Sequence, residues 1–338
     1  MPGQSLSPFQ RVMNTAPSLD FPAGAVIIGR NEGARFLACL ETALKAGLSP
    51  LVYVDSGSTA GSVEAARAAG ADVVLLDTRR PFTAARARNA GLERLTDRAE
   101  PPPYVQFLDG DCALREGWIA TATAFLDAHP QVAAGAGRLR ERFPEASIYN
   151  RILDNEWAAP PGEARACGGN AMMRVTAMEA AGGFNAAMIA GEEPELCVRL
   201  RQAGWKIWRL EAEMAWHDAA MTRFRQWWIR TRRAGHAYAE GAAMHGRAPE
   251  RHYVPQLRRA LLWGLALPLA ILLGLLITPW ALALALLWPL KIARLMASGR
   301  EPWSAVLLTV GNISESAGVL TYIWKRATGN HSRLIEYK

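Results

Sequence analysis

The residues best suited to chemistry are Asp109 and Asp111, which are separated by Gly110. They follow the apolar run 104–108, which predicts a buried strand. Open α/β sheets bind their ligands at the carboxyl ends of strands, and carboxylate oxygens suit hard divalent cations that also contact phosphates. The two aspartates therefore indicate a metal-assisted phosphate site, although a strand followed by an ordinary Asp-Gly turn would show the same three residues.

Strands and helices alternate along the first third of the chain. Apolar runs that predict buried strands are separated by stretches with helical spacing: strands at 25–28, 51–54, 73–76 and 104–108, and helices at 33–45, 63–69 and 82–95. This alternation is typical of a doubly wound, mainly parallel α/β sheet.

Polar side chains follow two of the other predicted strands. Arg30, Asn31 and Glu32 come after the first strand, and Asp55 comes after the second. The carboxyl ends of parallel strands meet at one edge of a sheet, where such sheets hold their ligands. We therefore expect these side chains to converge with Asp109 on one crevice, although strand ends are commonly polar in any case.

A second group of acidic residues lies farther along the chain. Residues 138–161 show no clear periodicity and are expected to be irregular. A helix is expected to begin near Glu192, because Pro194 suits a first helical turn and acidic groups there suit the helix dipole. Glu192 and Glu193 can therefore be ordinary helix-start residues or carboxylates directed into the crevice.

The formal net charge of +7 comes from one segment. Residues 223–259 hold nine arginines against Glu240 and Glu250, so their own net charge is also +7 and the remainder of the chain is neutral on balance. A basic block can bind nucleic acid, a membrane surface or a phosphorylated ligand. No nucleic-acid-binding motif accompanies this block, and it runs into an apolar segment. We therefore expect an anionic membrane surface as its partner, and no nucleic acid.

Residues 260–290 contain no charged side chain and are too many for one ordinary membrane-spanning helix. Thr278 and Pro279 interrupt them, which predicts a hairpin that crosses a membrane twice or a re-entrant pair of helices; a buried pair in a soluble protein is the alternative. Basic residues flank both ends and none lies at the turn, so both ends are expected in the cytoplasm. The apolar stretch 303–324 carries polar residues and is expected to be interfacial or packed against the hairpin.

The cysteines and the amino terminus say little about function. Four cysteines stand far apart, none with the spacing of zinc ligands and with no sign of a disulfide framework: Cys39, Cys112, Cys167 and Cys197. This usage fits a reducing compartment. Residues 1–24 lack the basic start and apolar core of a signal peptide and are interpreted as a polar lead-in.

Taken in order, the motifs of residues 24–241 resemble those of family 2 glycosyltransferases of the GT-A type, specifically the bacterial membrane-associated members. The matching segments occur in the order expected of that family: 26–32 (VIIGRNE), 54–59 (VDSGST), 87–92 (ARNAGL), 109–111 (DGD), 168–170 (GGN) and 192–193 (EE). Ser56 replaces one Asp of the family's Asp-Asp-Gly-Ser-Thr, and Glu193 stands where the family usually has Asp. Residues 225–228 match the Gln-x-x-Arg-Trp motif of processive synthases only loosely, which disfavours processive polymerisation.

The resemblance implies a GT-A α/β fold with a doubly wound, mainly parallel sheet, followed by a C-terminal membrane-embedded helical hairpin. It implies transfer of a sugar, with inversion, from a nucleoside diphosphate donor to a membrane-associated, lipid-linked acceptor in cell-surface polysaccharide or glycolipid synthesis. The expected location is the bacterial inner membrane, with the catalytic domain on the cytoplasmic side.

The resemblance also implies a role for each matching residue. We expect Glu193 as the catalytic general base, with Glu192 as the second candidate, and the binding residues are these: Asn31, Glu32, Asp55, Arg88 and Asp109 for the nucleotide-sugar; Asp111, Asp109 and His217 for Mn²⁺ or Mg²⁺; and Gly169 and Asn170 on the acceptor side. An ordinary, partly buried histidine is the alternative for His217.

Five parts are expected along the chain: a flexible lead-in (1–23), the catalytic domain (24–222), a basic interfacial helical linker (223–259), a transmembrane or re-entrant hairpin (260–297), and an interfacial helix with the C-terminal tail (298–338). The alternative function is a catalytically weak, nucleotide-sugar-binding membrane partner of another synthase. The substitutions at Ser56 and Glu193 motivate it, and intact Asp109 and Asp111 oppose it. A nucleotidyltransferase is disfavoured because residues 29–33 lack the Gly-rich, Lys-bearing loop of such enzymes.

Overall fold

The computed structural model describes residues 23–59 and 61–329, so almost all of the expected lead-in lies outside the described residues. The described chain divides into two compact units. The first comprises the chain up to residue 143 together with 153–187 and 192–220, and the second comprises 144–152, 188–191 and the chain from residue 221 onward. The change of unit after Ala220 lies close to the domain boundary expected at residue 222.

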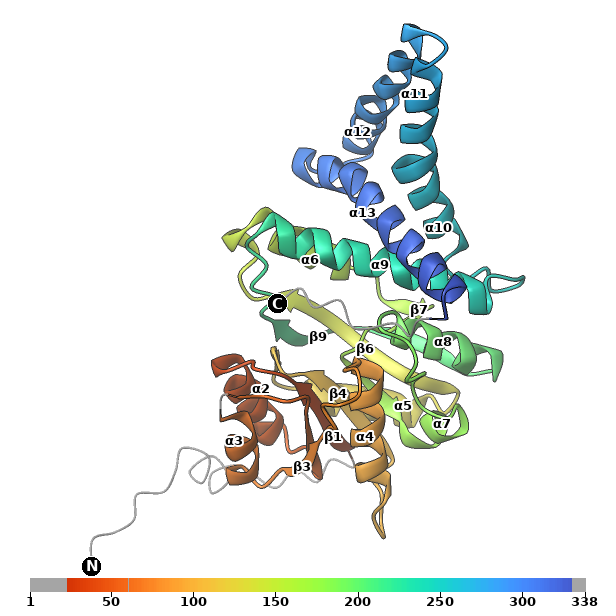
Figure 1. Ribbon diagram of the computed structural model, residues 1–338. Coiled ribbons are helices and arrows are strands. Elements are labelled where there is room, and N and C mark those ends of the chain that lie inside the picture. The colour runs from red at the N-terminus through yellow and green to blue at the C-terminus, as the bar shows by residue number, and fades with distance from the viewer. Residues whose placement is uncertain (1–22, 60, 330–338) are drawn as a thin grey trace, which may run out of the picture. The chain divides into compact units, whose positions relative to one another are not determined.

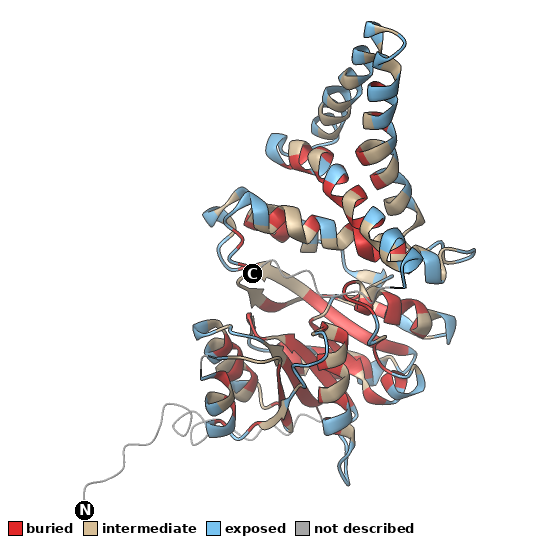
Figure 2. Ribbon diagram, in the orientation of Figure 1, coloured by how far each residue is buried: buried red, intermediate tan, exposed pale blue. Residues whose placement is uncertain are grey.

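The first unit begins with four parallel strands in the order β3-β2-β1-β4 (Figure 1). The elements agree with the prediction to within a few residues at their ends: β1 (Ala23–Gly29), α2 (Ala34–Lys45), β2 (Leu51–Asp55), α3 (Ser62–Ala68), β3 (Asp72–Leu75), α4 (Ala84–Thr96) and β4 (Tyr104–Asp109). β1, β2 and β4 are buried along most of their length (Figure 2), as expected of parallel strands covered on both faces.

The remaining strands make the sheet mixed. β8 (Ala171–Arg174) pairs antiparallel with β4 and with β6 (Val132–Glu141). β6 pairs parallel with β9 (Lys206–His217), whereas β5 (Cys112–Leu114) and β7 (Gly162–Ala164) pair antiparallel with β9. The full order is β3-β2-β1-β4-β8-β6-β9-β5, with β7 beside β9. The mainly parallel sheet expected from the sequence is therefore parallel across β3, β2, β1 and β4, and it continues with mixed pairing.

Residues 138–161 are not irregular, so that expectation is wrong. They contain the end of β6, the short helix η1 (Pro144–Ala146) and α6 (Ile148–Trp157). Further helices of the fold lie outside this range: α5 (Trp118–Ala128), α7 (Val175–Ala180) and α8 (Glu192–Gln202). The sequence does not predict β6 because this strand is rich in alanine and glycine, which have low strand propensity. Its small residues allow a close contact, since a Cβ at Gly137 would lie 2.5 Å from the carbonyl oxygen of Ala212 on β9.

The second unit is helical. Its main elements run in this order: α9 (Phe224–His245), α10 (Val254–Leu261), the π-helix η2 (Leu262–Ala266), α11 (Leu267–Leu275), η3 (Pro279–Leu286), α12 (Leu287–Ala297) and α13 (Pro302–Ala327). Between α11 and η3 the chain turns at Thr278, whose hydroxyl accepts a hydrogen bond from the Trp280 backbone N–H. A Cβ at Gly274 would lie 2.6 Å from Ala281 Cβ, so the two arms approach closely. They form the helical hairpin expected from the sequence.

Three helical segments of the second unit are long and apolar enough to cross a membrane: Val254–Leu275, Pro279–Ala297 and Pro302–Ala327. Large apolar side chains cover the outside of the hairpin, and at its turn Leu276 is 83% exposed and Ile277 is 86% exposed (Figure 2). A contiguous exposed apolar surface of this kind is typical of a membrane or partner contact.

α13 packs along α9 through small residues. A Cβ at Gly235 would lie 1.9 Å from the carbonyl oxygen of Glu315, and a Cβ at Gly318 would lie 2.0 Å from that of Arg232. Such close approach of two backbones requires glycine at the contact. Arg259 of α10 adds an ion pair of 2.7 Å with Glu315. α13 also packs against the hairpin, because a Cβ at Gly264 would lie 1.9 Å from the carbonyl oxygen of Asn312. This is one of the two arrangements expected for the segment.

Candidate functional site

Arg88 joins the two acidic motifs of the first unit. Its Nη2 donates to Asp109 Oδ1 at 2.8 Å, and its Nη1 donates to Glu192 Oε1 at 2.7 Å. Only 3% of the Arg88 side chain is exposed. Burial alone would lower the pKa of Arg88, but the charges of Asp109 and Glu192 raise it above its usual value. The guanidinium therefore stays charged and links Asp109 to Glu192.

Two neighbours of Arg88 on α4 fix its position. A Cβ at Gly91 would lie 2.3 Å from Val26 Cγ1, so glycine lets α4 approach β1 closely. Asn89 Nδ2 donates to the Phe184 carbonyl oxygen at 2.7 Å, and Asn89 Oδ1 accepts from the Phe184 N–H at 2.8 Å. Residues 87–91 (ARNAG) thus each have a structural role where contacts are seen. Gly91 allows α4 to pack closely on β1, Asn89 binds the loop after α7, and Arg88 binds the carboxylates.

Gly169 and Asn170 contact the same pair of residues. Asn170 Oδ1 accepts from the Asp109 backbone N–H at 2.8 Å, and Asn170 Nδ2 donates to Asp109 Oδ2 at 3.2 Å. A Cβ at Gly169 would lie 2.3 Å from Arg88 Nη2, so a larger residue would displace the guanidinium. In the structure both residues support the Arg88–Asp109 pair, and their acceptor-side role stays a prediction.

Asn31 and Asp55 hold one loop from two sides. Asp55 Oδ2 accepts from the backbone N–H groups of Gly57 and Ser58 at 2.9 and 2.8 Å. Asn31 Oδ1 accepts from the Thr59 N–H at 2.8 Å, and the Asn31 N–H donates to Ser58 Oγ at 3.0 Å. Hydrogen bonds from a short polar side chain to nearby backbone are what stabilise such turns. The strand ends of β1 and β2 are therefore tied together, as their predicted convergence requires.

Glu32 lies next to the DGD motif. A Cβ at Gly110 would lie 3.3 Å from Glu32 Cγ, and the Gly110 N–H donates to the Ile28 carbonyl oxygen at 2.8 Å. Glu32 forms an ion pair of 2.8 Å with Arg35, whose Nη1 donates to the carbonyl oxygen of Asp218 at 3.1 Å. The ends of β1 and β4 are thus adjacent, as expected of neighbouring parallel strands.

Asp111 and His217 meet across the β5–β9 pair. Cys112 stands opposite His217 in the strand register, and Asp111 Oδ1 lies 3.5 Å from His217 Nε2. Glu141 Oε2 lies 3.5 Å from Nδ1 of the same ring. Carboxylate oxygens suit Mg²⁺ and Mn²⁺, and a histidine ligand commonly has its second ring nitrogen fixed by a carboxylate. Asp111 and His217 therefore fit a divalent cation, with Glu141 orienting the ring.

Asp109 lies outside this group of ligand atoms. The group comprises Asp111, Cys112 and His217, whose ligand atoms lie within 4.8 Å of one another. Both carboxylate oxygens of Asp109 are instead engaged by Arg88 and Asn170. Of the three residues predicted to bind the metal, the structure brings two together and ties the third to the guanidinium.

Glu193 has a different environment from its neighbour Glu192. Its Oε1 accepts from the Cys167 N–H at 2.7 Å and lies 3.2 and 2.9 Å from the Sγ atoms of Cys167 and Cys197. Both glutamates lie in the first turn of α8 and are buried. Glu192 is tied to the charged Arg88, whereas these contacts of Glu193 are with neutral donors and all go to Oε1. Its Oε2 receives none of these hydrogen bonds.

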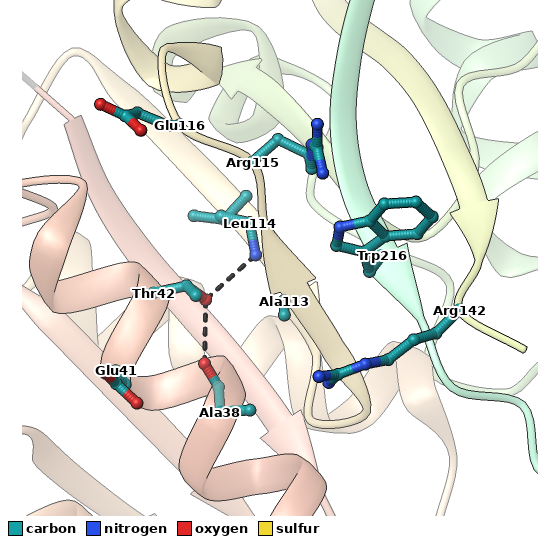
Figure 3. Close-up of a pocket in the computed structure, with 9 residues that line it drawn as sticks. All are labelled: Ala38, Glu41, Thr42, Ala113, Leu114, Arg115, Glu116, Arg142 and Trp216. Carbon is teal, nitrogen blue, oxygen red and sulfur yellow. Dashed lines mark hydrogen bonds between the residues drawn. The ribbon is translucent and has the colours of Figure 1, made fainter.

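A pocket of about 480 Å³ opens beside β5 (Figure 3). Within it, Thr42 Oγ1 of α2 accepts from the Leu114 N–H and donates to the Ala38 carbonyl oxygen, both at 3.0 Å. Successive side chains of a strand point to opposite faces, so Trp216 in this pocket and His217 lie on opposite faces of β9. The described lining includes none of the predicted site residues, and the pocket is separate from the Asp111–His217 pair.

Sequence reasoning did not find Glu141, Cys167 or Cys197. The wide spacing of the cysteines along the chain is misleading, because the Sγ atoms of Cys167 and Cys197 are 3.7 Å apart. One local signal existed: Glu193 and Cys197 are four residues apart and so share a helix face. No local pattern marks Glu141, because it is the last residue of β6, whose alanine-rich sequence does not predict a strand.

Comparison with known families agrees with this geometry. The model of the family "Glycosyl transferase family 2" matches residues 25–181. That segment includes Asn31, Asp55, Arg88 and the DGD motif. Residues 25–181 are therefore similar to a glycosyltransferase family 2 domain.

Among curated proteins, the chain is similar to the "Pre-mycofactocin glycosyltransferase" of Mycobacterium tuberculosis, in strains CDC 1551 / Oshkosh and ATCC 25618 / H37Rv. Identity is 31% over 240 residues in both cases. The match covers 65% of this chain and 47% of the relative. The chain thus spans about half the length of the curated relatives it matches.

Among solved structures, the chain is similar to the mannosyltransferase PcManGT from Pyrobaculum calidifontis, determined in complex with GDP-Man and Mn²⁺. The TM-score is 0.56 at 19% identity, with 94% of each chain covered. It is also similar to S. aureus TarS, with a TM-score of 0.50 at 16% identity, covering 71% of this chain and 43% of that one. These likenesses concern the fold and confirm a GT-A-like α/β core.

Proposed function

We propose that this chain is an inverting, metal-dependent glycosyltransferase. It moves a sugar from a nucleoside diphosphate donor to a membrane-associated, lipid-linked acceptor in the synthesis of a cell-surface polysaccharide or glycolipid. The observation that carries the proposal is one edge of the sheet in a family 2 domain, where Arg88 holds Asp109 and where Asp111 faces His217.

The donor would lie over the carboxyl ends of β1, β2 and β4. Asn31 and Asp55 would fix the base and ribose through the loop that they hold, and Glu32 would contribute from beside Gly110. Arg88 and Asn170 would orient Asp109 toward the donor, since both already bind its carboxylate. The complex of PcManGT with GDP-Man and Mn²⁺ gives fold-level support for a donor and an ion of these classes.

Asp111 and His217 would hold the divalent cation, Mn²⁺ or Mg²⁺. Such a cation neutralises the charge that develops on the leaving diphosphate. Glu141 would keep the His217 ring in the orientation that presents Nε2 to the site, because its carboxylate lies 3.5 Å from Nδ1.

Inversion requires a base on the side of the sugar away from the leaving group, where the acceptor hydroxyl attacks. Glu193 is the proposed base, and the free Oε2 supports this choice because Oε1 already accepts the hydrogen bonds of Cys167 and Cys197. Glu192 is the second candidate, and its ion pair with Arg88 favours a positioning role instead.

The helical hairpin would insert into the bacterial inner membrane with the catalytic domain on the cytoplasmic side. The arginines of residues 223–259 would then face anionic headgroups, each contributing up to about 1 kcal/mol near the surface. We propose that α13 stays at the interface, because it packs along α9, whose arginines are costly in hydrocarbon. This arrangement would bring a lipid-linked acceptor to the crevice without leaving the membrane.

The test uses the full-length protein in bilayer nanodiscs with Mn²⁺, a panel of sugar nucleotides that includes GDP-Man, and polyprenyl phosphate or glycolipid acceptors. The proposal predicts labelled lipid product and stoichiometric release of nucleoside diphosphate with at least one donor, and neither with Asp111→Asn. Donor binding without product across the panel would favour the alternative, a catalytically weak nucleotide-sugar-binding partner of another synthase.

A further inference from the structure

A second group of potential metal ligands lies apart from Asp111 and His217. Cys167, Glu193 and Cys197 each offer a ligand atom, and these atoms lie within 4.8 Å of one another. Glu193 and Cys197 are one turn apart on α8, and Cys167 comes from the segment between β7 and β8. The three side chains are buried, with 4% or less of each residue exposed. They are therefore shielded from bulk water and share one small space.

The distances in this group match the corners of a tetrahedron around one ion. Thiolates bind Zn²⁺ at about 2.3 Å, which places two sulfur ligands about 3.8 Å apart in tetrahedral geometry. The observed Sγ–Sγ distance between Cys167 and Cys197 is 3.7 Å. Glu193 Oε1 lies 3.2 and 2.9 Å from the two sulfurs. A carboxylate oxygen bound to the ion at about 2.0 Å would lie about 3.5 Å from each sulfur. A shift of a few tenths of an ångström in one side chain is therefore enough.

We propose that Cys167, Glu193 and Cys197 form a binding site for one thiophilic divalent cation, represented by Zn²⁺ or Cd²⁺. On binding, each thiol releases its proton to solvent, and the ion is held by two thiolates, one carboxylate oxygen and a water molecule. Two thiolates and a carboxylate around a divalent ion leave a net charge of −1. Arg209 of β9 lies close enough to Cys167 and Glu193 for their charges to interact, and it balances this charge.

Ligand chemistry separates this site from the Asp111–His217 pair. Two sulfur ligands favour soft and borderline ions such as Zn²⁺, whereas the other group offers a carboxylate, an imidazole and one sulfur, that of Cys112. Carboxylates suit Mg²⁺ and Mn²⁺. The two sites therefore take different ions.

Occupancy would stop catalysis, a consequence that rests on the proposed function. An ion that coordinates the Glu193 carboxylate removes its capacity to accept a proton from the acceptor. Micromolar Zn²⁺ should therefore inhibit transfer even when Mn²⁺ saturates the Asp111–His217 site.

Binding is tested with Cd²⁺ on the full-length protein, kept reduced with a phosphine and supplied with excess Mg²⁺. We expect thiolate-to-Cd²⁺ charge-transfer absorption that saturates at one equivalent. The absorption should be lost in Cys167→Ser and in Cys197→Ser and kept in Cys39→Ala, which removes a buried thiol outside the group. Glu193→Gln keeps both thiols and should weaken Cd²⁺ binding at least tenfold. This variant tests the site even if a serine variant does not fold.

Absorption that survives in both serine variants, or that is lost in Cys112→Ala instead, would overturn the site. Unchanged Cd²⁺ affinity in Glu193→Gln would remove the carboxylate from the ligand set and overturn the proposal as stated. Cd²⁺ binding that follows the pattern predicted, in a protein with no transfer activity on any donor, would leave this site standing while the proposed function fails.

Discussion

The guanidinium of Arg88 lies 2.8 Å from the carboxylate of Asp109 and bridges it to Glu192 at 2.7 Å. This contact joins α4 and β4, which follow one another in the chain, to α8, since Glu192 is 104 residues from Arg88. Arg88 is buried, and 34% of the Asp109 side chain is exposed. The two ion pairs therefore stabilise the packing of these elements and orient Asp109 of the DGD motif.

Replacing Arg88 should be costly because it leaves the buried Glu192 and the partly exposed Asp109 without their cation. We expect Arg88→Ala to lower the free energy of unfolding by about 3–5 kcal/mol. Arg94→Ala is the matched control on the same helix: its ion pair with Asp72 is 2.7 Å long, but its side chain is 53% exposed, and such pairs contribute less than about 1 kcal/mol. Denaturant unfolding of both variants tests this, and equal losses would contradict the role given to Arg88.

The assignment of the general base is tested by a pair of neutral substitutions. Glu193→Gln should lower kcat at least about a hundredfold, the usual effect of losing an acid–base group, and should leave donor affinity nearly unchanged. Glu192→Gln should act mainly on donor affinity, since Glu192 contacts Arg88. Steady-state kinetics and donor titration separate the two. A large loss of kcat in Glu192→Gln alone would show that the assignment is off by one residue.

A pH effect on stability is expected from Glu240 on α9. Burial raises the pKa of this carboxyl from 4.5 to about 7, and Lys325 opposes the shift. Because the folded-state pKa is raised, the protonated form stabilises the fold, and that stability is lost as the pH rises through 7. Glu240→Gln, which stays neutral, should thus match the wild type near pH 5 and exceed it near pH 8 by up to about 3 kcal/mol.

The comparison for Glu240 is made by thermal unfolding in one detergent at both pH values. His236, whose Nδ1 lies 3.6 Å from Glu240 Oε2, has a pKa lowered by burial to about 4. Its lowered pKa makes the fold more stable as the pH rises, which is opposite to the effect of Glu240. His236 is present in the wild type and in Glu240→Gln, so its contribution largely cancels in the difference between their stabilities. A stabilisation that is the same at pH 5 and pH 8 would contradict the raised pKa of Glu240.

Membrane topology distinguishes a hairpin from three crossings. If the hairpin alone enters the bilayer, reporter tags inserted after Arg258 and after Lys338 should be accessible from the same face. Three crossing helices would place them on opposite faces, and that result would contradict the interfacial position proposed for α13. Alkaline extraction should leave the full-length chain with the membranes.

The sequence predicts the first half of the sheet well and the second half poorly. β1, β2 and β4 are continuous apolar runs bounded by polar residues, so each is recognisable without its partners. β6 is largely alanine and glycine, and its strand conformation depends on pairing with β9, some seventy residues away by register (Ala136 with Arg209). A pattern that reflects close backbone contact rather than side-chain burial cannot be identified by hydrophobic periodicity.

The site shows the same division between local and long-range information. Asp109, Asp111 and Arg88 lie in short motifs with a fixed spacing, and the structure brings the expected partners together. Glu141 and Cys167 acquire their roles only when distant segments meet, so no local pattern marks them. For Gly169 the structure shows a steric reason, in the space that Arg88 occupies, and its acceptor-side role stays a prediction.

The central claim is that Asp111 and His217 hold the divalent ion on which sugar transfer depends. Release of nucleoside diphosphate by the full-length protein in nanodiscs, measured after chelation by EDTA and again after Mn²⁺ is restored, tests it most directly. The account predicts that EDTA abolishes release, that Mn²⁺ restores it in the wild type, and that Mn²⁺ fails to restore it in Asp111→Asn. Undiminished turnover of the wild type in EDTA, or full activity of Asp111→Asn, would contradict it.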